Sequence, residues 1–182
     1  MAQPHILFIP GLGDRVWLYQ LAAPLWQVFG YATHVHRFGW NDGSRSLGEK
    51  QAELIRYVDD LPADRLYVIG MSAGGTAAVN LLMQRPTIRK VITIASPLRT
   101  KDSPTNGFLM GSIGQVEATL PTASEKLRKK IVSVHGSYDS RVPVPKSQPR
   151  GIQTMRLPTV GHGLTIALAL TVYGGAIRRL LR

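Results

Sequence analysis

The feature that most constrains this chain is a serine flanked by glycines, G-x-S-x-G at positions 70–74, directly after the apolar run Leu66–Ile69. The run predicts a buried strand, and a helix is predicted over 73–84. A serine between a strand and a helix lies in a sharp, strained turn that tolerates only small residues two positions away on either side. We therefore expect the Ser72 hydroxyl to project at the top of the sheet, beside the first N–H groups of the helix.

The same pattern has a plainer interpretation, a glycine-rich turn that only packs tightly or binds a phosphate. A phosphate-binding loop of the G-x-x-x-x-G-K-[ST] type needs a lysine, and none follows here. The placement between a strand and a helix therefore favours a nucleophile.

Short apolar runs alternate with helical stretches along the chain, which predicts an α/β fold with a mostly parallel sheet. Asp14 is a candidate N-cap for a helix over 15–29, and Ser46 and Glu49 have capping-box spacing. The segment 97–125 is expected to form a long irregular connection, with or without one short helix. The predicted strands span 6–9, 32–37, 66–69, 91–95, 131–135 and 153–157, and the other predicted helices span 46–61, 73–84 and 164–181.

A serine hydroxyl needs a base, because it is a poor nucleophile at neutral pH. In the order serine, acid, histidine, only His135 and His162 can be that base, since the other three histidines precede Ser72. His135 lies inside a predicted strand and is interpreted as structural. His162 lies between two glycines after the last predicted strand, which predicts it as the base, although it could also be a capping or solvent-facing histidine.

The acid is expected in the loop after the strand 131–135, where Asp139 lies. Its role would be to hold the imidazole tautomer and to stabilise the imidazolium. Alternatively, Asp139 makes only a local turn hydrogen bond, or pairs with Arg141. For the oxyanion hole we predict the backbone N–H groups of Ala73 and of Leu12, in the loop after the first strand.

Together these motifs resemble the α/β-hydrolase superfamily, and most of all its small lidless bacterial lipases and esterases and its small serine hydrolases. The resemblance spans nearly the whole chain through segments 8–13, 68–75, 91–97, 136–143 and 161–162. It implies a minimal α/β-hydrolase fold of about six mostly parallel strands, with helices on both faces. Two departures are Pro10-Gly11, where many relatives have His-Gly, and the absence of the usual first two strands.

No large cap domain fits between the predicted elements, so the site should be open to an ester with a bulky or lipid-like group. Ordinary packing explains each candidate lining residue at least as well as substrate contact does. The candidates for substrate contact are Trp40, Phe108, Leu109 and Met110.

The 182 residues fit one domain, 1–182, and the formal net charge is +11. Of the 22 Lys and Arg residues 13 lie in positions 92–182, against four of the 11 Asp and Glu residues. This surplus is explained by solubility, or by peripheral contact with an anionic membrane. Basic residues do not interleave with aromatic ones, so no nucleic-acid partner is expected.

No cysteine is present, which excludes a Cys-based zinc site, and no metal or cofactor is expected. The chain opens without a basic segment, and its apolar stretches are shorter than the about 20 residues of a spanning helix. These observations predict a cytoplasmic protein.

The predicted function is hydrolysis of carboxylic esters, small or lipid, through an acyl-enzyme on Ser72. Thioester hydrolysis or acyl transfer on the same triad is an alternative. A non-catalytic binding protein of the same fold is another, although such a protein has no need for all three triad residues.

Overall fold

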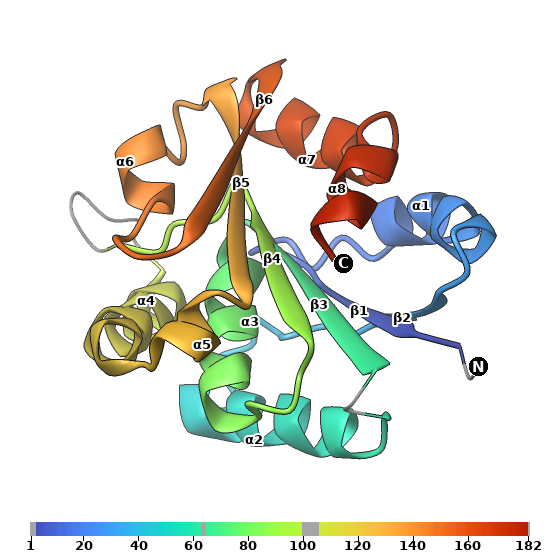
Figure 1. Cartoon of the computed structure of the whole chain (residues 1–182). Coiled ribbons are helices and arrows are strands. Elements are labelled where there is room, and N and C mark those ends of the chain that lie inside the picture. The colour runs from blue at the N-terminus through green and yellow to red at the C-terminus, as the bar shows by residue number, and fades with distance from the viewer. Residues whose placement is uncertain (1–2, 63–64, 100–105, 182) are drawn as a thin grey trace.

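A six-stranded sheet in the order β2-β1-β3-β4-β5-β6 forms the centre of the molecule, and all neighbouring strands are parallel (Figure 1). The computed structural model describes residues 3–62, 65–99 and 106–181. The predicted α/β class and parallel sheet are confirmed. The strands are β1 (His5–Ile9), β2 (Ala32–Val35), β3 (Leu66–Met71), β4 (Lys90–Ile94), β5 (Ile131–Tyr138) and β6 (Gln153–Val160).

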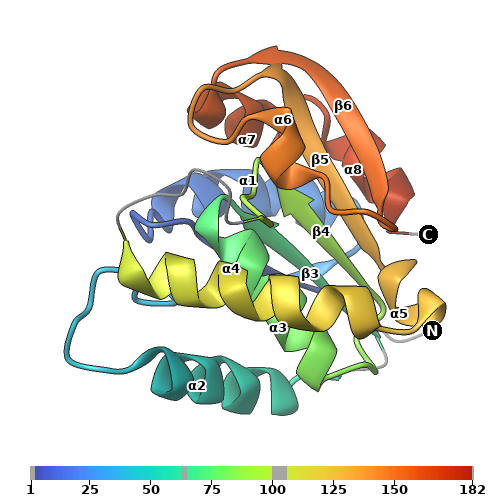
Figure 2. The same ribbon diagram turned by 90° about the vertical axis from the view of Figure 1, so that its left-hand side faces the viewer.

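Helices cover both faces of the sheet (Figures 1 and 2). In β1, Ile6 and Phe8 belong to the core on the side of α1, α7 and α8, whereas Leu7 and Ile9 belong to the core on the side of α2, α3 and α4. This alternation follows from the two-residue period of a strand. The helices are α1 (Trp17–Val28), α2 (Leu47–Asp59), α3 (Ala73–Gln84), α4 (Gly107–Thr119), α5 (Glu125–Arg128), α6 (Val144–Ser147), α7 (His162–Leu170) and α8 (Gly174–Leu180), with a 3-10 turn over Leu120–Thr122.

The segment after β4 corrects one prediction. Positions 97–125 were expected to be mostly irregular, yet α4 covers 13 of these residues. Its glycines weaken the helical pattern in the sequence, but Leu109, Ile113 and Val116 are buried at helical spacing against the core. Packing of this apolar face stabilises a helix that local propensity does not favour.

Two other predicted helices also differ. The final helix is two helices, because α7 ends at Leu170 and Tyr173 N–H donates to Leu168 O at 2.8 Å before α8 begins. Asp14 is not the cap of α1, which begins at Trp17 with Val16 at its N-cap position. The capping box of Ser46 and Glu49 is confirmed at the start of α2.

Parallel strands bring all their carboxyl ends to one edge of the sheet. The connections that follow β1, β3, β4, β5 and β6 therefore meet at this carboxyl edge, and each predicted catalytic residue lies on one of them. No separate cap covers this edge in the described ranges. Among the same residues, no helix has the length and apolar character needed to cross a membrane.

Candidate active site

Ser72 occupies the turn between β3 and α3 with φ 52° and ψ −125°. This left-handed region is costly for a residue with a side chain, by about 1–3 kcal/mol. The Ser72 N–H donates to Ile94 O at 2.9 Å, which ties the turn to the end of β4. The predicted strand–turn–helix placement of the serine is thereby confirmed.

The glycines on either side of the serine allow the chain segments to come this close. A Cβ on Gly70 would lie 2.4 Å from Gly74 O, and a Cβ on Gly74 would lie 2.0 Å from Ile9 O. Both distances are far below van der Waals contact with backbone atoms. The motif therefore reflects close packing of β3, the start of α3 and the end of β1.

Three side chains from different connections form a chain of hydrogen bonds. Ser72 Oγ lies 3.0 Å from His162 Nε2, and His162 Nδ1 lies 2.7 Å from Asp139 Oδ2. The Asp139 side chain is 2% exposed and that of His162 13%. A carboxylate at this position fixes the proton on Nδ1 and leaves Nε2 to accept the serine proton.

The loop after β5 holds the Asp139 carboxylate by its backbone. Asp139 Oδ1 accepts hydrogen bonds from the N–H groups of Arg141 at 2.9 Å and Val142 at 3.0 Å. Arg141 thus contacts the carboxylate through its backbone N–H, whereas the His162 side chain contacts it through Nδ1. The turn hydrogen bonds and the histidine contact occur together, so those two interpretations of Asp139 are not exclusive.

The end of β6 sets the position of His162. Gly161 has φ 95°, and its N–H donates to Tyr138 O at 2.8 Å, which joins the ends of β5 and β6. Thr165 Oγ1 donates to Gly161 O at 2.8 Å from the first turn of α7. The other candidate, His135, is buried with Nδ1 3.0 Å from Gly136 O and Nε2 2.6 Å from the Gln148 amide.

The loop after β1 passes directly over the serine. A Cβ on Gly11 would lie 2.8 Å from Ser72 Cβ and 3.3 Å from Ser72 Oγ, so only glycine fits there without a shift. Ala73 is the first residue of α3, and the first N–H groups of a helix have no partner within it. The Leu12 N–H thus belongs to the loop that carries Gly11 over the serine, and the Ala73 N–H follows Ser72 directly in the chain.

Residues 39–42, after β2, hold the Gly11 loop in place. Trp40 Nε1 donates to Pro10 O at 3.1 Å, and Asn41 Nδ2 donates to Leu12 O at 2.6 Å. Trp40 is fully buried in the core, which corrects its prediction as a substrate contact. Its size and indole N–H serve to hold the loop that faces Ser72.

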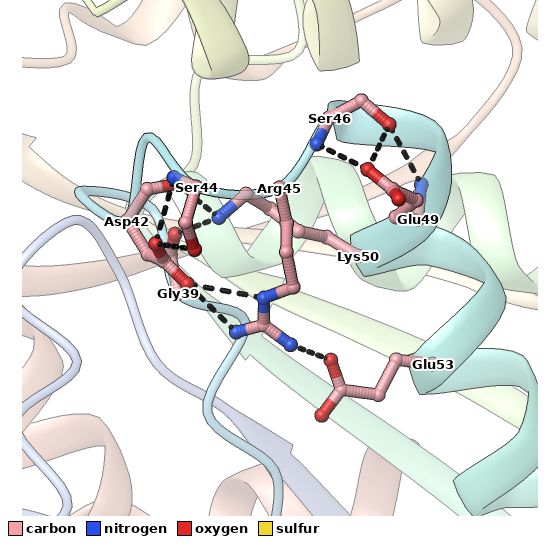
Figure 3. A network of polar contacts seen from close by, with 8 residues as sticks. All are labelled: Gly39, Asp42, Ser44, Arg45, Ser46, Glu49, Lys50 and Glu53. Carbon is pink, nitrogen blue, oxygen red and sulfur yellow. Dashed lines mark hydrogen bonds and ion pairs between the residues drawn. The ribbon is translucent and has the colours of Figure 1, made fainter.

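A buried lysine in turn holds residues 39–42 (Figure 3). Lys50 Nζ donates to Gly39 O at 2.5 Å and to Asp42 O at 2.6 Å, and the residue is 1% exposed. Around it, Arg45 pairs with Asp42 and Glu53. Lys50 was not among the predicted residues. The sequence carries a signal for it, since Lys50 has the helical spacing of Leu54 and Val58 on the buried face of α2.

The cavity at Ser72 has a volume of about 870 Å³. Leu109 is among its lining residues, as predicted, whereas Trp40, Phe108 and Met110 are not among the described ones. Phe108 instead lies under Lys50, whose Nζ is 4.7 Å from the ring centroid. The apolar part of the wall includes Leu12, Leu18, Tyr19, Met71, Leu109, Val142 and Ile166.

Comparison with known proteins identifies the fold. No family model matches the chain, and no curated protein matches it in sequence. Among solved structures, the esterase domain of a Rhodothermus marinus protein matches with TM-score 0.69 at 18% identity, over 98% of this chain and 88% of that chain. This chain has the α/β-hydrolase fold.

Two further solved structures also match the chain over most of their own length. The monoacylglycerol lipase of Paleococcus ferrophilus matches with TM-score 0.70 at 12% identity, over 100% of this chain and 96% of that chain. The thioesterase domain from the curacin biosynthetic pathway matches with TM-score 0.69 at 14% identity, over 99% of this chain and 91% of that chain. At these identities the likeness establishes the α/β-hydrolase fold and leaves the activity to be argued from the site.

Proposed function

We propose that this protein is a serine hydrolase that cleaves carboxylic esters through an acyl-enzyme on Ser72. The observation that carries the proposal is the continuous hydrogen-bonded chain from Ser72 Oγ through His162 to Asp139, at 3.0 and 2.7 Å. It lies at the wall of an open cavity, on a fold whose solved neighbours include esterases and a lipase.

In the first half-reaction Ser72 Oγ forms a bond to the ester carbonyl carbon, and its proton passes to His162 Nε2. The carbonyl electron pair moves onto the oxygen, where the N–H groups of Leu12 and Ala73 would stabilise the charge. Asp139 stabilises the imidazolium. When the carbon–alkoxide bond breaks, the leaving group takes the proton from His162, and the acyl group remains on Ser72.

In the second half-reaction a water molecule attacks the acyl carbon and gives a proton to His162 Nε2. Collapse of the second tetrahedral intermediate returns that proton to Ser72 Oγ and releases the carboxylic acid. Loss of one oxyanion-hole donor is expected to cost about 2.7–4 kcal/mol of transition-state stabilisation.

A fluorophosphonate probe and a panel of 4-nitrophenyl esters of increasing acyl length test the proposal. Wild-type protein should be labelled and should hydrolyse part of the panel. The Ser72→Ala variant should fold, resist labelling and lose about 10⁶-fold in kcat, down to background. Ser124→Ala, at the N-cap of α5, is the matched control and should be labelled like wild type. Labelling that survives in folded Ser72→Ala would refute the assignment.

A thioesterase with the same triad is the second candidate, because one solved neighbour is a thioesterase domain. The same acyl groups presented as N-acetylcysteamine thioesters distinguish the two, through the ratio of the kcat/KM values. Wild-type protein that neither reacts with the probe nor cleaves any ester or thioester would favour the non-catalytic binding protein.

A further inference from the structure

Four cationic residues line the cavity that contains Ser72. They are Arg15, Arg99, Arg141 and Lys146, and no aspartate or glutamate is among the described lining residues. A concave site with charges of one sign raises the local concentration of the opposite charge. The wall of this cavity is therefore suited to an anion.

These charges converge from three separate segments of the chain. Arg15 precedes α1, Arg99 follows β4, and Arg141 and Lys146 lie between β5 and the end of α6. The Leu98 N–H donates to Lys146 O at 2.8 Å, so the segments that carry Arg99 and Lys146 are side by side. Charges brought together by the fold differ from a solvated run along one helix.

The described carboxylates nearest in the chain to Arg15 and Arg141 already accept hydrogen bonds. Asp139 is bound to His162 and to the N–H groups of Arg141 and Val142, and Asp14 accepts a hydrogen bond from Trp40 N–H. Within the described part of the chain, none of the ion pairs involves the guanidinium of Arg15, Arg99 or Arg141. Among the described residues, the guanidinium charges of Arg15, Arg99 and Arg141 are thus not balanced by an ion pair with a carboxylate.

Arg99 also lines a second cavity, of about 550 Å³, together with Arg128 and Arg150. One acidic residue, Glu117, lies in that lining. Arg128 is partly used within the protein, since its guanidinium donates to Ala123 O and Pro121 O. Because Arg99 is shared, cationic side chains continue from the Ser72 cavity into its neighbour.

We propose that the substrate is an ester that carries an anionic group, a carboxylate or a phosphate, held by Arg99, Arg141 and Lys146 beside Ser72. This inference rests on the proposed ester hydrolysis. A guanidinium binds such oxyanions with two parallel hydrogen bonds, and the apolar wall at Leu18, Met71 and Ile166 leaves room for an uncharged chain.

Two pairs of esters test the proposal and distinguish the position of the anion. In the acyl pair, 4-nitrophenyl hydrogen suberate is compared with methyl 4-nitrophenyl suberate. In the alcohol pair, 4-acetoxyphenyl phosphate is compared with 4-acetoxyanisole. For each pair the ratio of kcat/KM, anionic over neutral, is measured for wild type and variants at low and at near-physiological salt. Division by the wild-type ratio cancels the intrinsic reactivity of the esters.

In at least one pair, Arg99→Gln, Arg141→Gln and Lys146→Gln should each lower the ratio about two- to fivefold, the range of a partly exposed ion pair. The triple variant should lose about tenfold or more, and added salt should lower the wild-type ratio. Arg56→Gln on α2 removes the same charge outside both cavities and should leave the ratio unchanged.

The outcomes separate this inference from the proposed function. Unchanged ratios in the three variants, with Ser72-dependent hydrolysis of the neutral esters, would overturn the inference and leave the esterase proposal standing. Equal losses in Arg56→Gln would show a general charge effect and would also overturn it. No Ser72-dependent hydrolysis of any ester would instead refute the proposed function.

Discussion

At the scale of single residues, Asp14 shows that the loop over Ser72 forms at a cost in folding free energy. It has φ 42°, and its Oδ2 accepts the Trp40 N–H at 3.2 Å, while Oδ1 is buried with no hydrogen-bond partner among the described residues. Burial raises the pKa of Asp14, and the N–H groups of residues 38–40 and the charge of Arg37 only partly oppose this. The ionised carboxylate is thus less stable in the folded protein than in the unfolded chain.

The Asp14→Asn variant should reveal this cost through pH. Because the pKa is raised on folding, the folded state binds the proton more tightly, and wild-type stability falls as pH rises from about 4 through the folded pKa. Asparagine tolerates a positive φ and keeps the acceptor for Trp40, but it has no proton to lose. The free energy of unfolding of Asp14→Asn minus that of wild type should therefore increase with pH across this window and then level off. Urea denaturation at several pH values measures it, and a difference that declines with pH would contradict the assignment.

Asn41 offers a test of how the same loop is positioned. Its side chain is exposed, and its amide N–H₂ donates to Leu12 O at 2.6 Å. Asn41→Asp keeps the shape but removes the donor, so the Leu12 N–H should lose its alignment with the oxyanion. We expect kcat to fall about tenfold with KM nearly unchanged, since the loss acts mainly in the transition state. An equal rise in KM, or a large loss of thermal stability, would indicate a different role for Asn41.

At the scale of elements, the turn between β3 and α3 depends on contacts that no local propensity records. The prediction is that Gly74→Ala destabilises the fold by about 3 kcal/mol or more, because its Cβ would overlap Ile9 O at 2.0 Å. Gly114→Ala in α4 is the control. Its Cβ meets nothing within 4 Å, so it should stabilise the protein by about 0.5–1 kcal/mol through helix propensity. Urea denaturation of both variants measures this pair, and similar stabilities would contradict the packing argument.

The sequence predicts elements well where pattern and local chemistry agree. The strand before Ser72, the helix 73–84 and the capping box of α2 follow from apolar runs and capping residues. The sequence does not predict α4, because its glycines weaken the helical pattern of the buried face. It also predicts the wrong role for Asp14, whose carboxylate accepts a hydrogen bond from Trp40 N–H and does not cap α1. Both outcomes are decided by contacts between residues far apart in the chain.

The same limit applies to the candidate site. Ser72, Asp139 and His162 could be predicted as one site because each follows a predicted strand. Parallel strands bring the residues that follow them to one edge of the sheet. Lys50, Asn41 and the cationic lining could not, because their roles arise from three-dimensional contacts of the loops. Trp40 was misassigned for the same reason, since an aromatic residue in a loop can fill the core as well as a pocket.

At the scale of the whole molecule, one group of basic residues lies at the edge of the sheet opposite Ser72. Residues 126–130 directly precede β5 and therefore lie at the amino edge, whereas Ser72 lies at the carboxyl edge. Lys130 is partly used within the fold, since its Nζ donates to Pro86 O at 2.7 Å and Ile88 O at 2.9 Å. Its pKa is lowered by burial and then by the nearby charges of Lys126 and Arg89.

The distance of these basic residues from Ser72 makes the predicted contact with an anionic membrane testable apart from catalysis. A protein docked through α5 would hold Ser72 away from the lipid, so binding and ester hydrolysis should be separable. Lys126 and Lys129 are exposed and should each contribute about 1 kcal/mol to binding at an anionic surface. Lys126→Gln/Lys129→Gln should therefore weaken binding to vesicles with anionic lipid about tenfold or more, while hydrolysis of a soluble neutral ester stays unchanged.

The measurement is cosedimentation with phosphatidylcholine vesicles, with and without phosphatidylserine, at low and near-physiological salt. Arg37→Gln/Arg56→Gln removes two charges elsewhere and should bind like wild type, since these residues lie on the β2–α2 connection and on α2. Wild-type binding should fall with salt, because exposed charges are screened within about 10 Å at 0.1 M. Equal losses in both double variants would mean that net charge, rather than α5, attracts the lipid. Equal binding to neutral and anionic vesicles, or no binding to either, would leave solubility as the explanation of the charge.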